Sequence, residues 1–151
     1  MYHYVSFDMK IILYLFKNYS KIDTGLLTTR IVFGFFMIYN HGYGKIIGGP
    51  EKWERLGGVL TDLIGMKFLQ TFFGLMASLS ESLFSLFIIF GLFTRLSSFF
   101  LGFTMSIATL KHLLEFELPE MAIIYLTFST LIIFSGPGKY SLDNFILKKF
   151  N

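Results

Sequence analysis

The chain has 151 residues, enough for one domain; 54% of them are hydrophobic and only 15% are charged. A typical soluble domain is about 25% charged, so this composition predicts a protein embedded in a lipid bilayer. The net charge of +3 without a basic patch excludes a nucleic-acid partner, and the absence of cysteine excludes disulfides, thiolate catalysis, iron–sulfur clusters and c-type haem.

Residues 1–24 predict an amphipathic helix lying on the membrane surface, with a disordered tail as the alternative. Asp8 and Lys10 interrupt the most apolar part of this segment, and no small-residue cleavage site follows. These features argue against a cleaved signal peptide. Residues 25–151 then form the membrane domain.

The first apolar segment, Gly25–Tyr43, predicts a membrane-spanning helix. The polar stretch that follows cannot span, but it carries apolar residues at helical spacing between glycines. It therefore predicts a short interfacial helix with a tryptophan at the headgroup level. The residues of this pattern are Trp53, Leu56, Val59, Leu60 and Leu63.

Three more apolar segments predict further spans: Phe68–Phe93, Leu96–Leu110 and Pro119–Gly136. The second and third are joined only by "FTR" and should form an antiparallel hairpin. The third is short for a span, so its ends must reach the interface or the bilayer must thin locally. The fold class expected is an all-α integral membrane four-helix bundle.

Four spans place both termini on the same side of the membrane. The termini and the loop between the second and third spans hold seven Lys and Arg residues, against five on the other side. The positive-inside rule therefore predicts a multi-pass protein with both termini in the cytoplasm.

Glu81 lies near the middle of the second span, where a charge costs about 2.5–3.5 kcal/mol on insertion scales. It must face the bundle interior, either as a proton-handling or ligand-binding carboxyl or as a structural ion pair. Helical spacing puts polar and small residues on one face of each of the first three spans, and we expect these faces to converge inside the bundle. The faces are Arg30, Gly34, Met37, His41 and Lys45; Gly74, Ser78, Glu81 and Ser85; and Ser98, Gly102, Met105, Thr109 and His112. Counting about 1.5 Å per residue from Lys21 and from Arg95 puts Arg30 about 8 Å from Glu81 in depth. An Arg30–Glu81 pair is therefore one prediction; an Arg30 side chain that reaches the cytoplasmic headgroups or Asp143 is the other.

His41 and His112 fall toward the outer ends of their spans. Such a pair could hold a b-type haem, bind a quinone carbonyl or bind a metal, but interfacial histidines are more often simply hydrogen-bonded. Neither haem nor a metal site is favoured. Glu120 follows Pro119 at the start of the fourth span, where an acid complements the helix dipole. This structural role is sufficient to explain Glu120, and a functional role is the alternative.

The stretch "GPGKYSLD", residues 136–143, ends the last apolar run. Gly136 and Pro137 predict a helix stop, and the following residues predict a short interfacial helix starting near Ser141 or Asp143.

With three other landmarks, this stretch resembles the DoxX family of small four-helix membrane proteins. The other landmarks are Arg30, Gly34 and Lys45 in "RIVFGFFMIYNHGYGK", Glu81 followed by "FGLFTR", and His112 followed by Glu120. The resemblance covers residues 25–143. Where the family often has a glycine soon after the glutamate, this chain reads "ESLFS".

The resemblance implies an inner-membrane four-helix bundle. Family members are linked to quinone-dependent oxidation, as in thiosulfate:quinone oxidoreductase, and to membrane oxidoreductase complexes of oxidative-stress defence. The expected cofactor is thus a quinone, and the expected partners are the bilayer and other membrane subunits. Glu81 and His112 are the candidate catalytic residues, and the candidate ligand-binding residues are Arg30, His41, Lys45, Glu81, His112 and Glu120.

Two other functions fit the same sequence. One is a non-catalytic anchor or assembly subunit of a larger membrane complex, favoured by the absence of cysteine and of any catalytic motif. The other is binding or passage of a small molecule or lipid through the bundle, which requires a water-accessible cavity that reaches one face.

Overall fold

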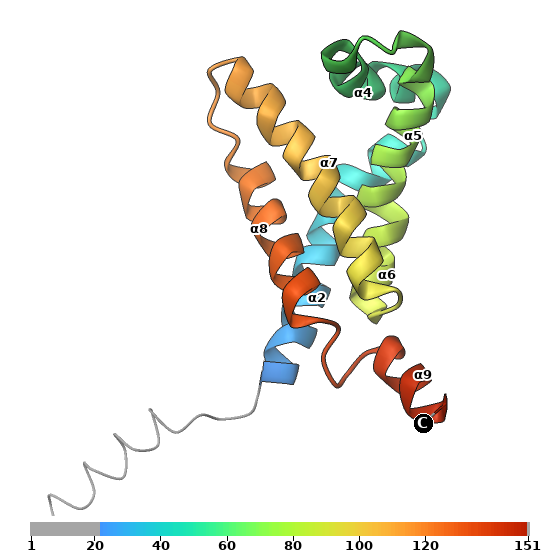
Figure 1. The fold of residues 1–151 in the computed structure, drawn as a ribbon, viewed down its shortest axis with the longest axis vertical. Helices are drawn as coiled ribbons and strands as arrows, with labels where there is room; N and C mark the ends of the chain where they lie inside the picture. The colour runs from blue at the N-terminus through green and yellow to red at the C-terminus, as the bar shows by residue number, and fades with distance from the viewer. Residues whose placement is uncertain (1–21, 151) are drawn as a thin grey trace, which may run out of the picture.

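The computed structural model describes residues 22–150, which contain helices and no strands (Figure 1). The surface helix expected for residues 1–24 lies outside this range, except that residues 22–24 already belong to α2. The elements, in order, are α2 (Ile22–Met37), η1 (Ile38–Gly42), α3 (Tyr43–Ile46), α4 (Gly49–Ile64), η2 (Lys67–Leu69), α5 (Gln70–Leu79), η3 (Ser80–Phe84), α6 (Ser85–Phe90), α7 (Thr94–Leu114), α8 (Glu120–Ser135) and α9 (Leu142–Phe150).

Two continuous helices are long and apolar enough to cross a membrane. They are Ile22–Ile46, with 25 residues, and Lys67–Phe90, with 24. The first contains the first predicted span, whereas the second ends at Phe90, before the predicted end at Phe93. The third predicted span was too short: α7 has 21 residues, because the helix continues through the polar residues that follow Leu110. At about 1.5 Å per residue, α7 is about 31 Å long. The fourth, α8, is a shorter apolar helix of 16 residues.

The polar faces expected for the first three spans point into the protein. Glu81 is 1% exposed and Arg30 is fully buried. They are surrounded by buried serine and threonine residues and by a core drawn from α2, η3–α6, α7 and α8. Its apolar members are Leu26, Met37, Ile88, Leu101, Met105, Tyr125, Phe128 and Ile132. The prediction that Glu81 faces the interior rather than lipid is thus confirmed.

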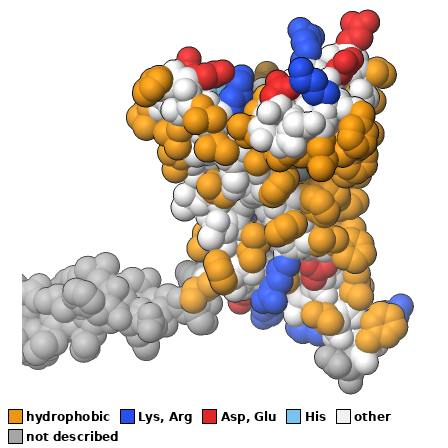
Figure 2. Space-filling view, turned by 45° about the horizontal axis from the view of Figure 1, so that its top comes forward, with side chains coloured by type: hydrophobic (Ala, Val, Ile, Leu, Met, Phe, Trp, Pro, Cys, Tyr) orange, Lys and Arg blue, Asp and Glu red, His pale blue; other side chains and the backbone are white. Residues whose placement is uncertain are grey.

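Large apolar side chains cover much of the outer surface between the two ends of the molecule (Figure 2). Phe35, Phe99 and Leu131 are each about half exposed, at 54%, 57% and 51%. The charged side chains visible in Figure 2 gather near the two ends instead. This distribution is typical of a protein whose middle is surrounded by hydrocarbon.

The helix expected between the first two spans exists and is α4, flanked by Gly48 and by the left-handed Gly65. It packs closely on α5 because Gly57 and Gly74 let the two backbones touch. The indole N–H of Trp53 donates to the carbonyl of Lys45 at 3.0 Å, so this ring ties α4 to the end of α3.

The stretch "GPGKYSLD" joins several helix ends at the end of the molecule near α9. The Asp143 carboxylate accepts the backbone N–H groups of Phe93 and Thr94, each at 2.8 Å, and the Thr94 hydroxyl at 2.7 Å. It therefore caps the N-terminus of α7 from a distant segment. The Ser141 hydroxyl accepts the N–H of Asn144 at 3.1 Å and caps α9, as predicted.

Arg30 is held at this same end. Its guanidinium donates through Nη2 to the carbonyl of Tyr140 and packs on Gly91, which has a φ of 67°. A side chain at position 91 would collide with both Arg30 and Ser141. "GPGKYSLD" is therefore more than a helix stop, because it closes one end of the bundle around a buried cation.

Candidate functional site

Two π-helical turns build the centre of the candidate site. Glu81 lies in η3, which interrupts the helix from α5 to α6, and His41 lies in η1, which interrupts the helix from α2 to α3. The turns touch each other: Gly42 of η1 lies against the backbone of Glu81, with no space for a side chain. Single π turns inside α-helices occur frequently at functional sites, because they redirect the side chains that they carry.

Glu81 forms an ion pair with Lys45. The Lys45 ammonium lies 2.7 Å from Oε1 and 2.6 Å from Oε2 of the carboxylate. The Glu81 side chain is 2% exposed, whereas the Lys45 side chain is 26% exposed. Lys45 lies about one turn beyond Gly42, and its side chain runs back toward the N-terminus of its helix, as helical geometry requires.

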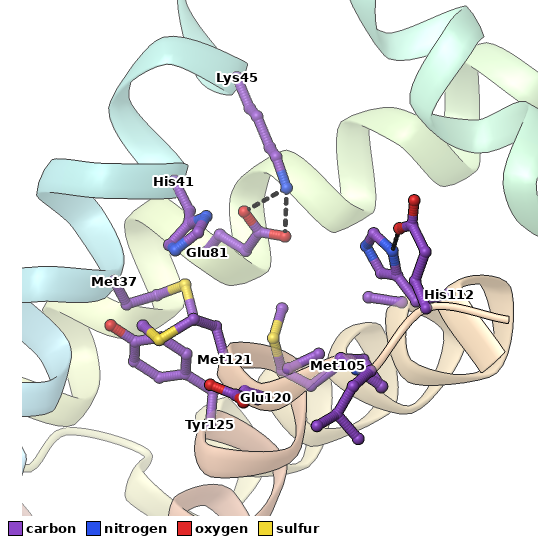
Figure 3. A pocket seen from close by; sticks show the side chains of 14 residues that line it. Met37, His41, Lys45, Glu81, Met105, His112, Glu120, Met121 and Tyr125 are labelled. Atoms are coloured by element: carbon purple, nitrogen blue, oxygen red, sulfur yellow. Dashed lines mark hydrogen bonds and ion pairs between the residues drawn. The ribbon is translucent and has the colours of Figure 1, made fainter. Parts of the chain in front are cut away.

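The ion pair forms part of the wall of a cavity of about 450 Å³ between the η1–α3 region, η3, α7 and the start of α8 (Figure 3). This volume lies within the range of about 300–1,000 Å³ that is usual for small-molecule sites. The polar lining residues are His41, Lys45, Glu81, His112, Glu117, Glu120 and Tyr125, and the apolar ones are Met37, Met105, Ala108, Leu118, Pro119, Met121 and Ala122.

The structure brings five of the six predicted ligand-binding residues to this one cavity: His41, Lys45, Glu81, His112 and Glu120. Arg30 is the exception, and the predicted Arg30–Glu81 pair is wrong. Gly42, not Arg30, lies level with Glu81, and Arg30 lies about 18 Å further along the helix axis. The estimate of depth assumed that the first two spans begin at the same level. The structure instead places the Arg30 side chain against Gly91, at the end of the second span.

Sequence reasoning missed several residues of the cavity wall, namely Met37, Met105, Met121, Tyr125 and Glu117. Met37 and Met105 did appear on the predicted polar faces, but methionine alone is typical of core packing. Nothing in the sequence connected Tyr125 with His41, although their rings meet edge to face at 5.9 Å. Only the contact of α8 with η1 makes them neighbours.

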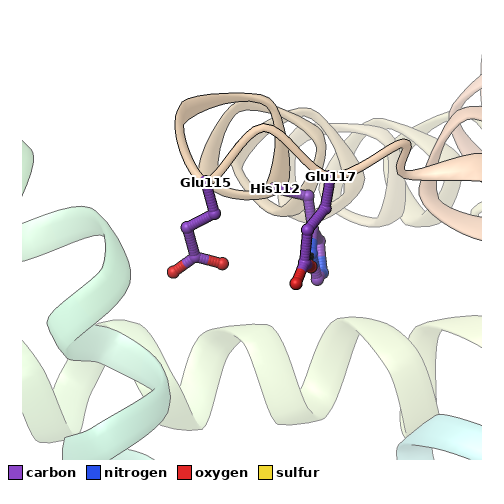
Figure 4. Close-up of side chains that lie close together, drawn as sticks. All are labelled: His112, Glu115 and Glu117. Atoms are coloured by element: carbon purple, nitrogen blue, oxygen red, sulfur yellow. Dashed lines mark hydrogen bonds and ion pairs between the residues drawn. The ribbon is translucent and has the colours of Figure 1, made fainter.

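His112 also has two acidic neighbours, Glu117 in the cavity wall and Glu115 beside it (Figure 4). Its Nδ1 atom lies 2.8 Å from a Glu117 oxygen, and possible ligand atoms of His112, Glu115 and Glu117 lie within 4.8 Å of one another. Glu115 also lies 3.7 Å from Lys111. Both carboxylates are exposed and both already have partners, so we interpret the group as surface ion pairs and not as a metal centre.

The cavity can accommodate a polar group beside a charge pair. Lys45 and the two histidines offer hydrogen-bond donors, and Glu81 offers a carboxylate almost fully removed from water. Thioether and aromatic groups form the rest of the wall, so a flat ring would find apolar contacts on its faces and donors at its edge.

Comparison with known proteins places the chain in a family. A family model described as DoxX matches residues 25–113, a range that includes His41, Lys45, Glu81 and His112. The chain is 32% identical over 136 residues to a protein of Escherichia coli (strain K12) named inner membrane protein YqjF. That match covers 85% of this chain and 96% of the relative. No solved structure matches the chain.

Proposed function

This chain belongs to the DoxX family of membrane proteins, and on that premise we propose that it is a quinone-binding membrane subunit of an oxidoreductase system. The ion pair of Lys45 and Glu81 at the wall of the cavity is the observation that carries the proposal. A buried carboxylate inside a membrane protein is by default a functional candidate.

The proposed topology is a multi-pass inner-membrane protein with both termini in the cytoplasm. The four spans would be the Ile22–Ile46 helix, the Lys67–Phe90 helix, α7 and α8. In this arrangement α4 and α9 lie at opposite ends of the molecule, as in Figure 1, each at a membrane interface. The α9 helix carries Lys148 and Lys149 in its last turn, which suits a cytoplasmic, anionic lipid surface.

The cavity meets the chemical requirements of a quinone head group. A quinone presents two carbonyl acceptors on a flat ring, and the cavity offers a cationic donor, imidazoles and polarisable apolar walls. When bound, a quinone would supply redox chemistry that the side chains of a chain without cysteine do not.

Each polar residue then has a defined task. Lys45 would orient an acceptor by donating a hydrogen bond, since its ammonium is already held by the Glu81 carboxylate. Glu81 would take up or release the proton that accompanies the redox change. His112 lines the cavity and contacts the exposed Glu117 at its rim, and the pair would pass a proton toward the outside.

The test is binding of a tail-less benzoquinone to the purified full-length protein. Glu81→Gln should weaken binding by at least about tenfold, a loss of about 1.4 kcal/mol. Glu54→Gln, which changes an exposed carboxylate on α4 outside the cavity, should leave binding unchanged. Protein that neither carries nor binds a quinone, yet co-purifies with a stable partner, would instead indicate a non-catalytic anchor or assembly subunit.

A further inference from the structure

A second cavity, of about 380 Å³, lies between α4, α5 and α7. Its wall is made mainly of aromatic and aliphatic side chains. They include Leu60 from α4, Phe73 and Met76 from α5, and Phe100 and Ile107 from α7. Nothing in the proposed head-group chemistry uses this space, and its lining offers few groups that a polar molecule could bind.

The two cavities share part of their walls. Lys45, Glu81, Ala108 and His112 line both of them. The ion pair therefore stands at the junction between a polar space and an apolar space. A molecule that filled both spaces would join a polar head beside Lys45 to a hydrocarbon chain.

We propose that the second cavity, here called the tail chamber, holds the hydrocarbon tail of the ligand whose head lies beside Lys45 and Glu81. This inference rests on the proposed function and narrows its substrate class to a quinone that is dissolved in the membrane. A water-soluble quinone would leave the tail chamber unused. The ion pair marks the point where head and tail meet.

The surroundings of the tail chamber indicate where such a ligand enters. Phe72 of α5 and Phe103 of α7 line the chamber and are 54% and 47% exposed. The two rings therefore present apolar surface both to the tail chamber and to the outside of the protein. A tailed molecule can therefore pass sideways from the bilayer between α5 and α7, without crossing water.

The chain offers a matched pair of substitutions. Ala77 lines only the tail chamber, whereas Ala122 lines only the polar cavity. Phenylalanine at either position adds the same volume to a different space. Ala77→Phe should obstruct a tail and leave the head site intact, and Ala122→Phe should obstruct the head.

The experiment compares a benzoquinone bearing a decyl tail with the same head group lacking the tail, on full-length protein in detergent. We expect Ala77→Phe to weaken binding of the decyl compound by about tenfold or more, because overpacking an apolar site is costly. Binding of the tail-less head should change by less than about twofold, well below the tenfold that corresponds to about 1.4 kcal/mol. Ala122→Phe should weaken binding of both compounds.

Unchanged binding of the decyl compound to Ala77→Phe would overturn the inference and leave the chamber to a lipid acyl chain. Equal weakening of both compounds would also overturn it. Neither result touches the proposed function, which fails only if the wild-type protein binds no quinone head. If Ala77→Phe does not fold, Val59→Phe on the opposite wall, in α4, provides the same test.

Discussion

Two regions of this molecule each hold a charge away from water, and they do so in different ways. At the end near α9, the Arg30 guanidinium is fully buried, donates to a backbone carbonyl and packs on Gly91. In the middle of the second span, the Glu81 carboxylate is paired with a lysine whose side chain is 26% exposed, and both cavities border the pair.

The difference separates structural residues from candidate site residues within one family pattern. Arg30 and "GPGKYSLD" fill space and cap helices. Lys45 and Glu81 balance each other's charge, and the partly exposed Lys45 side chain can move toward solvent. A charge pair that can exchange one partner for a ligand is the arrangement that binding requires.

The closed end should be the more sensitive to added volume. Gly91→Ala should destabilise the protein by about 2–5 kcal/mol, because alanine at positive φ costs about 1–2 kcal/mol and the new methyl group collides with Arg30 and Ser141. Thermal unfolding in detergent measures this. Gly25→Ala in α2, where nothing lies within 4 Å, is the control and should be neutral or slightly stabilising. Equal stability of the two variants would contradict a tightly closed end.

The cap on α7 should come next in size. Asp143→Asn removes the charge that accepts two backbone N–H groups and one hydroxyl, at a cost of about 2 kcal/mol. Quinone binding beside Lys45 and Glu81 should be unaffected. Asp62→Asn, an exposed carboxylate on α4, should change the unfolding temperature little. A loss of quinone binding in Asp143→Asn would show that the cap on α7 and the cavity are coupled.

Two double-mutant cycles should show directly whether Glu81 interacts with Lys45 or with Arg30. Glu81→Gln with Lys45→Gln should show a coupling of about 1 kcal/mol, less than for a fully buried pair because Lys45 is partly exposed. Glu81→Gln with Arg30→Gln should be additive within about 0.5 kcal/mol, since the residues share no partner. Strong coupling in the second cycle would restore the pairing that this structure rejects.

The smallest effect should come from the exposed pair at the rim of the polar cavity. Glu117→Gln removes a carboxylate that is 64% exposed and should change the free energy of unfolding by less than about 0.5 kcal/mol. If His112 passes protons toward Glu117, the pH dependence of quinone reduction by an added chemical electron donor should shift while stability does not. A large loss of stability would show that the pair of His112 and Glu117 has a structural role.

Several features could be predicted from particular residues. The cost of a carboxylate in hydrocarbon was enough to predict that Glu81 faces inward, and glycine, serine and threonine on the same faces predicted close helix packing. The helix now labelled α4 followed from apolar residues at helical spacing between glycines. The third span was predicted too short because hydropathy falls before the helix ends, at a place where backbone hydrogen bonding continues regardless.

By itself the sequence determined the family, the helical composition and the inward direction of the polar faces. These follow from the local period of the helix and from the solvent that the side chains avoid. Only the tertiary structure decided which charge pairs with which. That choice depends on how far two helices slide past each other, and close contact of Gly42 with Glu81 and of Arg30 with Gly91 fixes the register. The tail chamber depends on the same packing, because its walls come from three different helices, α4, α5 and α7.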